Sequence, residues 1–183
     1  KCKKIICCDI SSTDIIRHTI KDNPQIIFHL AANAYVPYSF EHPLEVNEVN
    51  VVGTLNILEA ARQIKGVKRI ICTSSSEVYG TALTKKINED HPLNPTSPYA
   101  ASKAAADRYC FSYIRTYNLP IVIIRPFNTY GPRHTYDVIP KFIKMAINND
   151  SITIHGDGKQ SRDLTYISDA VKAFLLVAEK KQC

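Results

Sequence analysis

The chain of 183 residues has no tryptophan, one methionine and six glycines, and none of the glycines precedes Gly53. No apolar run approaches the roughly 18 residues that a membrane-spanning helix needs, and no signal peptide opens the chain. We therefore expect neither a membrane protein nor a secreted one. The sequence also has no Cys-x-x-Cys pair and no cluster of histidines with ligand spacing, so we expect no metal site.

The cysteines do not form a pattern typical of disulfide scaffolds. Several lie inside apolar, strand-like runs, where cysteine behaves as a small buried hydrophobic residue. Free thiols are typical of a reducing compartment, so we expect a cytoplasmic protein. The six are Cys2, Cys7, Cys8, Cys72, Cys110 and Cys183.

The formal net charge is +6, but the lysines and arginines are scattered along the chain. Without a basic run or interleaved aromatic residues, nucleic-acid binding is not expected. A modest positive surplus suits a phosphorylated, anionic small molecule. The hydrophobic content of 45% allows a sizeable core, formed by one domain or by one domain and part of another.

Apolar runs alternate with helical patterns along the first two thirds of the chain. Short runs rich in β-branched residues separated by amphipathic segments predict βαβ units and a parallel sheet covered on both faces. The fold class is therefore α/β. The expected strands are 4–8, 26–32, 67–73 and 120–125, and the expected helices are 15–20, 43–65 and 98–117.

The pattern changes after residue 133, and we place a domain boundary there. An amphipathic helix is expected over 138–147, and two short strands over 151–155 and 163–167 around the turn Gly156-Asp157-Gly158. Ser168-Asp169 then offers an N-cap for a helix over 170–181. We divide the chain into the sheet domain (1–133), part of a smaller region (134–167) and a helix that returns to the sheet (168–183).

Tyr99 and Lys103 are four residues apart on the predicted helix 98–117, which places them on one face, about 6 Å apart at Cβ. An ammonium group beside a phenol favours the phenolate and lowers its pKa. Such a tyrosine can take a proton from a hydroxyl group as a hydride leaves the same carbon. The alternative is an amphipathic helix with a buried tyrosine and a solvated lysine.

Small or polar residues follow four of the expected strands. They are Asp9, Ala31-Ala32-Asn33, the segment Ser74 to Glu77, and Pro126-Phe127-Asn128. Each alone could be a helix cap, a close helix contact or a turn. Ligands of open parallel sheets bind at the carboxyl ends of the strands, so together these residues predict a binding site there.

The residues resemble an extended short-chain dehydrogenase/reductase of the nucleotide-sugar epimerase/dehydratase group. The resemblance covers essentially the whole chain and rests on motifs in a fixed order. They are Asp9-Ile10, His29-Leu-Ala-Ala32, Asn50-Val-Val-Gly-Thr-Leu-Asn56, Thr73-Ser-Ser-Ser-Glu-Val-Tyr-Gly80, Tyr99-Ala-Ala-Ser-Lys103, Arg125-Pro-Phe-Asn-Thr-Tyr-Gly-Pro-Arg133 and Arg162-Asp-Leu-Thr-Tyr-Ile-Ser-Asp169.

The resemblance implies a Rossmann-like, doubly wound parallel sheet, NAD as cofactor and a nucleotide-diphosphate sugar as substrate. The residues implied to contact or support the cofactor come from five segments. Asp9 and Ile10 would lie beside the adenine, and Leu30, Ala31 and Ala32 would lie beside the ribose and pyrophosphate. Asn50 would brace the sheet near the active site. Lys103 would bind the nicotinamide ribose together with Tyr99, and Pro126 would pack near the nicotinamide.

The resemblance also implies the catalytic and substrate residues. Tyr99 would be the acid/base, Ser75 would hydrogen-bond the reacting hydroxyl, and Ser76 would complete the Ser75-Ser76-Glu77 triplet. Glu77 stands where 4,6-dehydratases of this family carry the base that removes the C5 proton. Asn128, Arg133 and Arg162 would face the nucleotide-sugar, and a guanidinium at 162 suits a diphosphate.

We therefore expect a 4,6-dehydratase-like enzyme that oxidises C4, eliminates water across C5–C6 and reduces C6. The alternatives are a 4-epimerase, although these tend to have an uncharged residue at the position of Glu77, and a UDP-glucuronate decarboxylase, which also carries Ser-Glu at this place. An alternative from another class of protein is a non-catalytic fragment or binding module that keeps the fold without the glycine turn.

Two features depart from the family pattern. The glycine turn that opens the family's fold and holds the pyrophosphate at a helix N-terminus has no counterpart here. Cys8 also replaces the usual glycine before Asp9. We expect the chain to be a fragment that begins at the family's third strand and binds NAD poorly when isolated, and the complete enzyme to be a homodimer.

Overall fold

The computed structural model describes residues 4–154 and 156–180. Helices and strands alternate along most of the chain, and two short irregular helical segments are labelled η1 (π-helical) and η2 (3₁₀). In order, the elements are α1 (Asp14–Asp22), β1 (Ile26–His29), α2 (Val36–Glu41), α3 (Pro43–Asn47), η1 (Glu48–Val52), α4 (Gly53–Gln63), β2 (Arg69–Thr73), η2 (Ser76–Tyr79), α5 (Pro98–Tyr117), β3 (Ile121–Ile124), β4 (Asn128–Tyr130), α6 (Val138–Ile147), β5 (Leu164–Tyr166) and α7 (Ile167–Glu179).

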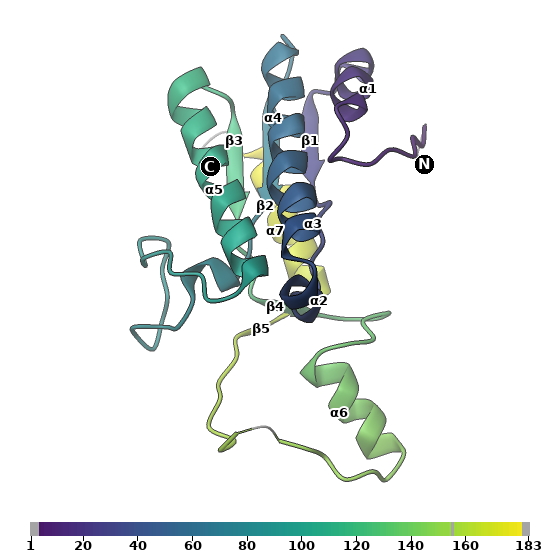
Figure 1. Cartoon of the computed structure of the whole chain (residues 1–183), viewed down its shortest axis with the longest axis vertical. Helices are drawn as coiled ribbons and strands as arrows, with labels where there is room; N and C mark the ends of the chain where they lie inside the picture. The colour runs from purple at the N-terminus through teal and green to yellow at the C-terminus, as the bar shows by residue number, and fades with distance from the viewer. Residues whose placement is uncertain (1–3, 155, 181–183) are drawn as a thin grey trace.

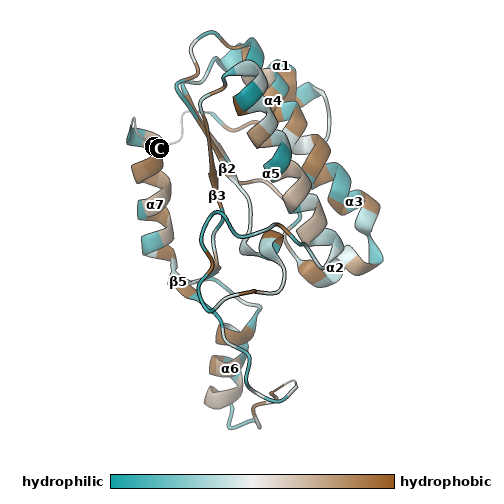
Figure 2. Ribbon diagram, turned by 90° about the vertical axis from the view of Figure 1, so that its left-hand side faces the viewer, coloured by the Kyte–Doolittle hydropathy of each residue, from teal (hydrophilic) through white to brown (hydrophobic). Residues whose placement is uncertain are grey.

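The central sheet has three parallel strands in the order β1-β2-β3, with Ile27 opposite Ile70 and Ile70 opposite Ile121. Helices α4 and α5 lie on one face of this sheet and α7 lies on the other (Figure 2). The two crossover connections between parallel strands thus lie on one face, and α7, which follows β5, covers the other. The expected α/β fold with a parallel sheet is confirmed.

The main core lies between the sheet and the helices α4 and α5. Its buried members are apolar residues from α4, β2, α5 and β3, namely Leu58, Ala61, Ile70, Cys72, Cys110 and Ile121. A second, smaller cluster of Val78, Tyr79 and Ala104 anchors η2 against α5, and Phe127 packs on it. The two clusters hold the carboxyl end of β2 against the start of α5.

The second region leaves the sheet after β3 and returns to it. β4 and β5 form a separate two-stranded parallel sheet, with Asn128 opposite Leu164. α6 and the segment that follows it project away from the central sheet, and α7 runs back along it (Figure 1).

The expected strand 4–8 is wrong, since residues 4–8 have no regular structure and Ile5 is 88% exposed. A strand is stabilised by a neighbour that completes its hydrogen bonds, and no described strand pairs with this segment. The expected strand 151–155 is also wrong over 151–154, and residue 155 lies outside the described residues.

Other boundaries differ from those expected. The helix 43–65 is interrupted by η1, and α7 begins at Ile167 without a side-chain cap, so the N-cap at Ser168-Asp169 is wrong. The end of that helix at 181 falls outside the described residues. The helices 98–117 and 138–147 are confirmed with their bounds, whereas α2 and β4 were not anticipated.

Candidate active site

The carboxyl ends of β2 and β3 continue side by side beyond the regular sheet. The Ser74 backbone N–H donates to Ile124 O (2.7 Å), and the Ser76 N–H donates to Pro126 O (3.1 Å). These two hydrogen bonds hold the segment Ser74–Ser76 alongside the residues that follow β3. The structure thus brings Pro126 beside the triplet that begins at Ser75.

The turn after β2 aims Glu77 outward. Ser75 is the N-cap of η2, and its hydroxyl oxygen accepts from the Glu77 N–H (3.2 Å). Gly80 ends the 3₁₀ turn at φ +66°, where an added Cβ would lie 1.9 Å from Asn94 O. Only glycine fits this position, so the spacing from Ser75 to Gly80 fixes the direction in which the exposed Glu77 points.

Tyr99 lies in the first turn of α5, which begins with Ser97 as N-cap and Pro98. The Ser97 hydroxyl accepts from the Ala100 N–H (3.1 Å), and proline suits the first helical position. Tyr99 is 8% exposed. Burial raises the pKa of its phenol, a hydrogen bond with the Ser75 side chain lowers it, and the charges of Glu77 and Tyr136 raise it further. The net effect is a raised pKa.

Lys103 lies one turn further along α5 and is 6% exposed, so the interpretation of a solvated lysine is wrong. Its ammonium donates to the Thr73 carbonyl oxygen at the end of β2. Burial lowers the pKa of Lys103, and Lys103 is not among the groups that shift the pKa of Tyr99. The expectation that Lys103 lowers the Tyr99 pKa is therefore wrong here, because burial dominates and the ammonium is turned to the strand.

Asn50 links the loop after β1 to α5. Its side-chain oxygen accepts from the Asn33 N–H (2.8 Å), and its amide donates to Asn33 O (3.0 Å) and to the Ser102 hydroxyl (2.9 Å). The Ser102 hydroxyl in turn donates to Tyr99 O (2.8 Å). Asn50 is 1% exposed and lies in the π-helical segment η1, a type of segment frequent at functional sites.

The loop containing Asp9 and Ile10 is held on α4. The Asn56 amide donates to Ile10 O (2.9 Å) and to Ser11 O (3.0 Å), and the Ile10 side chain covers Gly53, where a Cβ would lie 2.6 Å from it. Hydrogen bonds from the Ser11 N–H and hydroxyl lower the pKa of the Asp9 carboxyl. Asp9 therefore stays an ionised acceptor in the neutral range.

These groups fit part of a dinucleotide cofactor. Asp9 can accept from an amino group, and Lys103 can donate to ribose hydroxyls. Leu30 and Ala31 are exposed after β1 and Ala32 is half-buried, and the two alanine side chains are small enough to let a ligand approach the backbone. The described residues contain no glycine-rich turn at a helix N-terminus, so they offer no pyrophosphate cradle of that kind.

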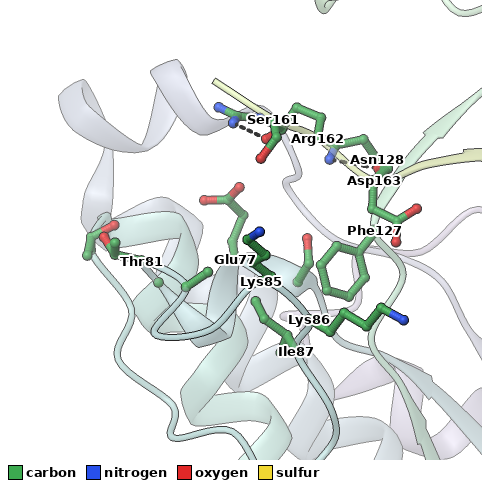
Figure 3. A pocket seen from close by; sticks show the side chains of 14 residues that line it. Glu77, Thr81, Lys85, Lys86, Ile87, Phe127, Asn128, Ser161, Arg162 and Asp163 are labelled. Carbon is green, nitrogen blue, oxygen red and sulfur yellow. Dashed lines mark hydrogen bonds between the residues drawn. The ribbon is translucent and has the colours of Figure 1, made fainter. Parts of the chain in front are cut away.

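A cavity of about 690 Å³ opens beside Glu77 (Figure 3). It brings together Ser76, Glu77, Asn128 and Arg162 from the expected site, and the Asn128 amide donates to Asp163 O (3.2 Å) at its edge. The sequence reasoning missed the loop that forms one wall. The sequence feature that could have pointed to this loop is the lysine pair Lys85-Lys86, shortly after Tyr79-Gly80. The wall and floor residues are Gly80, Thr81, Ala82, Lys85, Lys86, Ile87, Thr96, Phe127, Ser161 and Asp163.

Arg133 does not share this cavity. It is exposed at φ +70° and lines a different cavity of about 560 Å³ between the loop after β4 and α6. A third cavity of about 660 Å³ lies between Ala32-Asn33 and Tyr136, whose ring stands edge-on to Tyr35 with the centroids 5.9 Å apart. The structure thus separates Arg133 from Arg162 and adds Tyr136 to the surroundings of Tyr99.

A buried ion pair supports the site and was not anticipated. Arg125 donates from Nε and Nη2 to the two Asp107 oxygens (2.8 and 3.1 Å) and from Nη1 to the Tyr79 hydroxyl (2.9 Å). Burial raises the Asp107 pKa, but hydrogen bonds from Arg125 and Arg108 outweigh it, and the net shift is downward. The pair joins β3, α5 and η2.

A parallel sheet with a serine, a tyrosine and a lysine gathered at the carboxyl end of its middle strand defines a domain of the short-chain dehydrogenase/reductase type. The chain belongs to the NAD dependent epimerase/dehydratase family, whose model matches residues 1–183. The resemblance seen in the sequence is confirmed, and so is NAD as the cofactor of the family.

Relatives agree with this assignment. The dTDP-D-glucose 4,6-dehydratase of Homo sapiens is 42% identical over 175 residues, which cover 94% of this chain and 49% of that protein. The UDP-N-acetylglucosamine 4-epimerase of Methanobrevibacter ruminantium M1, solved with UDP-N-acetylmuramic acid, superposes with a TM-score of 0.89 at 38% identity, covering 97% of this chain and 58% of that one.

The dTDP-glucose 4,6-dehydratase DesIV of Streptomyces venezuelae, solved with NAD bound, superposes with a TM-score of 0.83 at 34% identity. The match covers 93% of this chain and 52% of that one. The chain spans about half the length of the curated relatives it matches. Among the described residues, no helix has the length and apolar character needed to cross a membrane, and no group of three or more His, Cys, Asp or Glu side chains is placed to hold a metal.

Proposed function

We propose that the protein is an NAD-dependent nucleotide-sugar 4,6-dehydratase. The observation that carries the proposal is the cavity in which Glu77, Asn128 and Arg162 face one space, next to the buried Ser75 and Tyr99. The likeness to the human dTDP-D-glucose 4,6-dehydratase supports the reaction type.

In this proposal Tyr99 exchanges a proton with the C4 hydroxyl, and Ser75 orients that hydroxyl through a hydrogen bond. NAD, when bound, would supply the hydride acceptor for C4 and the hydride donor for C6. Lys103 and Asp9 hold the cofactor at its two ends. The raised pKa of Tyr99 favours the protonated phenol, so taking the proton of the C4 hydroxyl is the demanding step for this side chain.

Glu77 acts on the oxidised sugar. A keto group at C4 acidifies the neighbouring C5 proton, and a carboxylate placed over that carbon can remove it. Arg162 suits the diphosphate, since a guanidinium binds two phosphate oxygens at once, and its Nη1 donates to the adjacent Ser161 O in this structure. Asn128 would face the sugar from β4. Arg133 would contact the substrate only from the separate cavity beside α6.

A 4-epimerase is the second candidate, supported by the fold likeness to the archaeal epimerase. Incubation of the complete encoded protein with NAD and dTDP-, UDP- and GDP-hexoses, read by mass spectrometry, separates the two reactions. We expect a product lighter by one water. An unchanged mass with an altered sugar indicates epimerisation, loss of carbon dioxide from UDP-glucuronate indicates a decarboxylase, and no turnover of any of these sugars indicates a non-catalytic binding module.

We further propose that 134–167 belongs to the substrate-binding region, because Arg162 reaches the cavity beside Glu77. Homodimerisation through α5 is supported by its exposed aromatic side chains Tyr109, Phe111 and Tyr117. A cytoplasmic location is supported by the free, buried Cys72 and Cys110. Size-exclusion chromatography with light scattering tests the dimer.

A further inference from the structure

The loop after η2 is pinned against the rest of the site. The Leu83 N–H donates to His91 Nε2 (3.2 Å), and His91 Nδ1 lies 2.9 Å from Pro92 O, a pair of contacts that assigns the proton to Nδ1. The His91 ring meets Tyr79 edge-on with the centroids 5.5 Å apart. Because Tyr79 is itself bonded to Arg125, the loop is attached to the buried ion pair.

Two lysines occupy the tip of this loop. The Thr84 hydroxyl donates to Lys86 O (2.6 Å), which closes a tight turn with Lys85 at its centre. In Figure 3 the side chain of Lys85 extends into the pocket that Glu77 also lines. Lys86 extends in another direction, beneath Phe127. Adjacent lysines therefore present their charges to different parts of the pocket.

The Lys85 ammonium is not engaged by a carboxylate. Among residues 4–154 and 156–180, the ion pairs within 4.0 Å include neither Lys85 nor Lys86. The cavity also holds Arg162 and Asp163, which are adjacent in sequence and lie on the wall opposite Glu77. The pocket that Glu77 lines thus also contains an ammonium group that is not held in an ion pair by the described carboxylates.

Elimination of water from a 4-keto sugar needs an acid as well as a base. The C5–H electron pair becomes the C5–C6 double bond, while the C6–O bond breaks and its electron pair leaves with oxygen. Departing hydroxide is a poor leaving group unless a proton reaches it. A lysine ammonium has a reference pKa of about 10.4, well below the value of about 15.7 for water, so this transfer is downhill. A serine hydroxyl such as that of Ser76 is a much weaker acid.

We propose that Lys85 is the general acid of the elimination and protonates the C6 oxygen after Glu77 has removed the C5 proton. This inference rests on the proposed dehydratase function. Lys85 gives up one proton, Glu77 gains one, and the sugar loses one water in total. When hydride is then added at C6, Glu77 returns its proton to C5, and Lys85 regains a proton from solvent after the product leaves. Lys85 thereby joins Glu77 as a residue that touches the reacting atoms.

The test uses Lys85→Met in the complete encoded protein loaded with NAD. Reduction of NAD on adding the nucleotide sugar and deuterium exchange from solvent into C5 should stay within a few-fold of wild type, because neither step needs the acid. Release of dehydrated product should fall about 100-fold or more, the usual value of a positioned acid. Lys21→Met is the control, since it removes one lysine charge from the exposed surface of α1, outside this cavity, and it should leave product release unchanged.

Two further variants separate proton donation from charge and from folding. Lys85→Arg keeps the positive charge but cannot readily give up a proton, so it should stay impaired. Lys85→Ala should recover product release when ethylamine is added, with a rate that follows the concentration of the protonated amine. A purely structural role would give rescue by Lys85→Arg and none by ethylamine.

Normal dehydration by Lys85→Met would overturn the inference and indicate that Glu77 returns its own proton to the C6 oxygen. Equal losses of C5 exchange and of elimination would also overturn it, because the acid acts only after the C5 proton is taken. If wild type reduces NAD but forms no dehydrated product from any hexose, the proposed function fails instead, and the two failures are distinguishable.

Discussion

The buried ion pair of Arg125 with Asp107 provides the sharpest test of how the site is supported. The Asp107 side chain is 0% exposed, and Arg125 supplies two of its hydrogen bonds. Arg125→Met leaves this carboxylate with Arg108, whose side chain is 50% exposed. Breaking a buried pair on one side costs about 3–5 kcal/mol. We expect the free energy of unfolding to fall by about 3 kcal/mol, at the lower end because Arg108 remains.

The assay is urea unfolding of the complete encoded protein, with the midpoint converted through an unchanged m-value. The control is the double variant Asp107→Leu with Arg125→Met. It removes both charges, so it should recover most of the loss, apart from about 1 kcal/mol for the unpaired Tyr79 hydroxyl. A single variant that loses less than about 1 kcal/mol, or a double variant as unstable as the single, would refute the reasoning.

The same pair predicts a pH dependence. The folded pKa of Asp107 is lowered, so its contribution to stability is fully present above the ordinary aspartate pKa and is lost as the pH falls through the folded value. Asp107→Asn should therefore weaken the protein at neutral pH and flatten its stability profile below about pH 4. An unchanged slope in acid would show that Asp107 is not the titrating group.

Further outcomes are expected at the site. Tyr99→Phe should lower turnover by about 10²–10⁴-fold while NAD affinity measured by calorimetry changes little, and near-normal turnover would remove Tyr99 as acid/base. Glu77→Gln should still reduce NAD on adding substrate but lose dehydrated product and deuterium exchange at C5, so that retained exchange excludes it as the base. Burial, followed by the Lys103 charge, lowers the pKa of His29 to about 4, so stability should decline as the pH falls from about 6.5 to 4, and His29→Gln should reduce that slope in urea titrations.

The sequence predicted the bounds of those helices whose first and last turns are marked by capping residues next to them in the chain. Helix α5 begins at Ser97-Pro98 and ends at Asn118, which adopts the left-handed conformation at φ 53°. Both signals lie next to the element they bound, so its limits were recoverable. The π-helical segment was not, because the apolar spacing of Val49, Val52 and Leu55 also fits an uninterrupted α-helix.

The candidate site was only partly predictable for a related reason. Ser75, Glu77 and Tyr99 follow strand ends or open helices, and topology alone brings such positions together. Lys85 reaches the same cavity through a long loop whose path depends on His91, and Arg125 finds Asp107 from another element. The lysine pair is visible in the sequence but its place in the cavity is not, and the contact of Arg125 with Asp107 leaves no local pattern. The direction of the Tyr99 pKa was missed because the burial of a side chain is a tertiary property.

The π-helical turn between α3 and α4 has a consequence for variation in chain length. A π turn closes on the fifth residue instead of the fourth, so it contains one residue more than an α-helical turn. The two flanking helices are consequently out of phase by about 100° relative to one continuous α-helix. Deleting one residue of Glu48–Val52 would restore regular α geometry yet rotate Asn50 away from Asn33 and Ser102. An insertion or deletion here that preserves helix content should therefore still uncouple the β1 loop from α5, and homologues should tolerate length changes on either side of this turn better than within it.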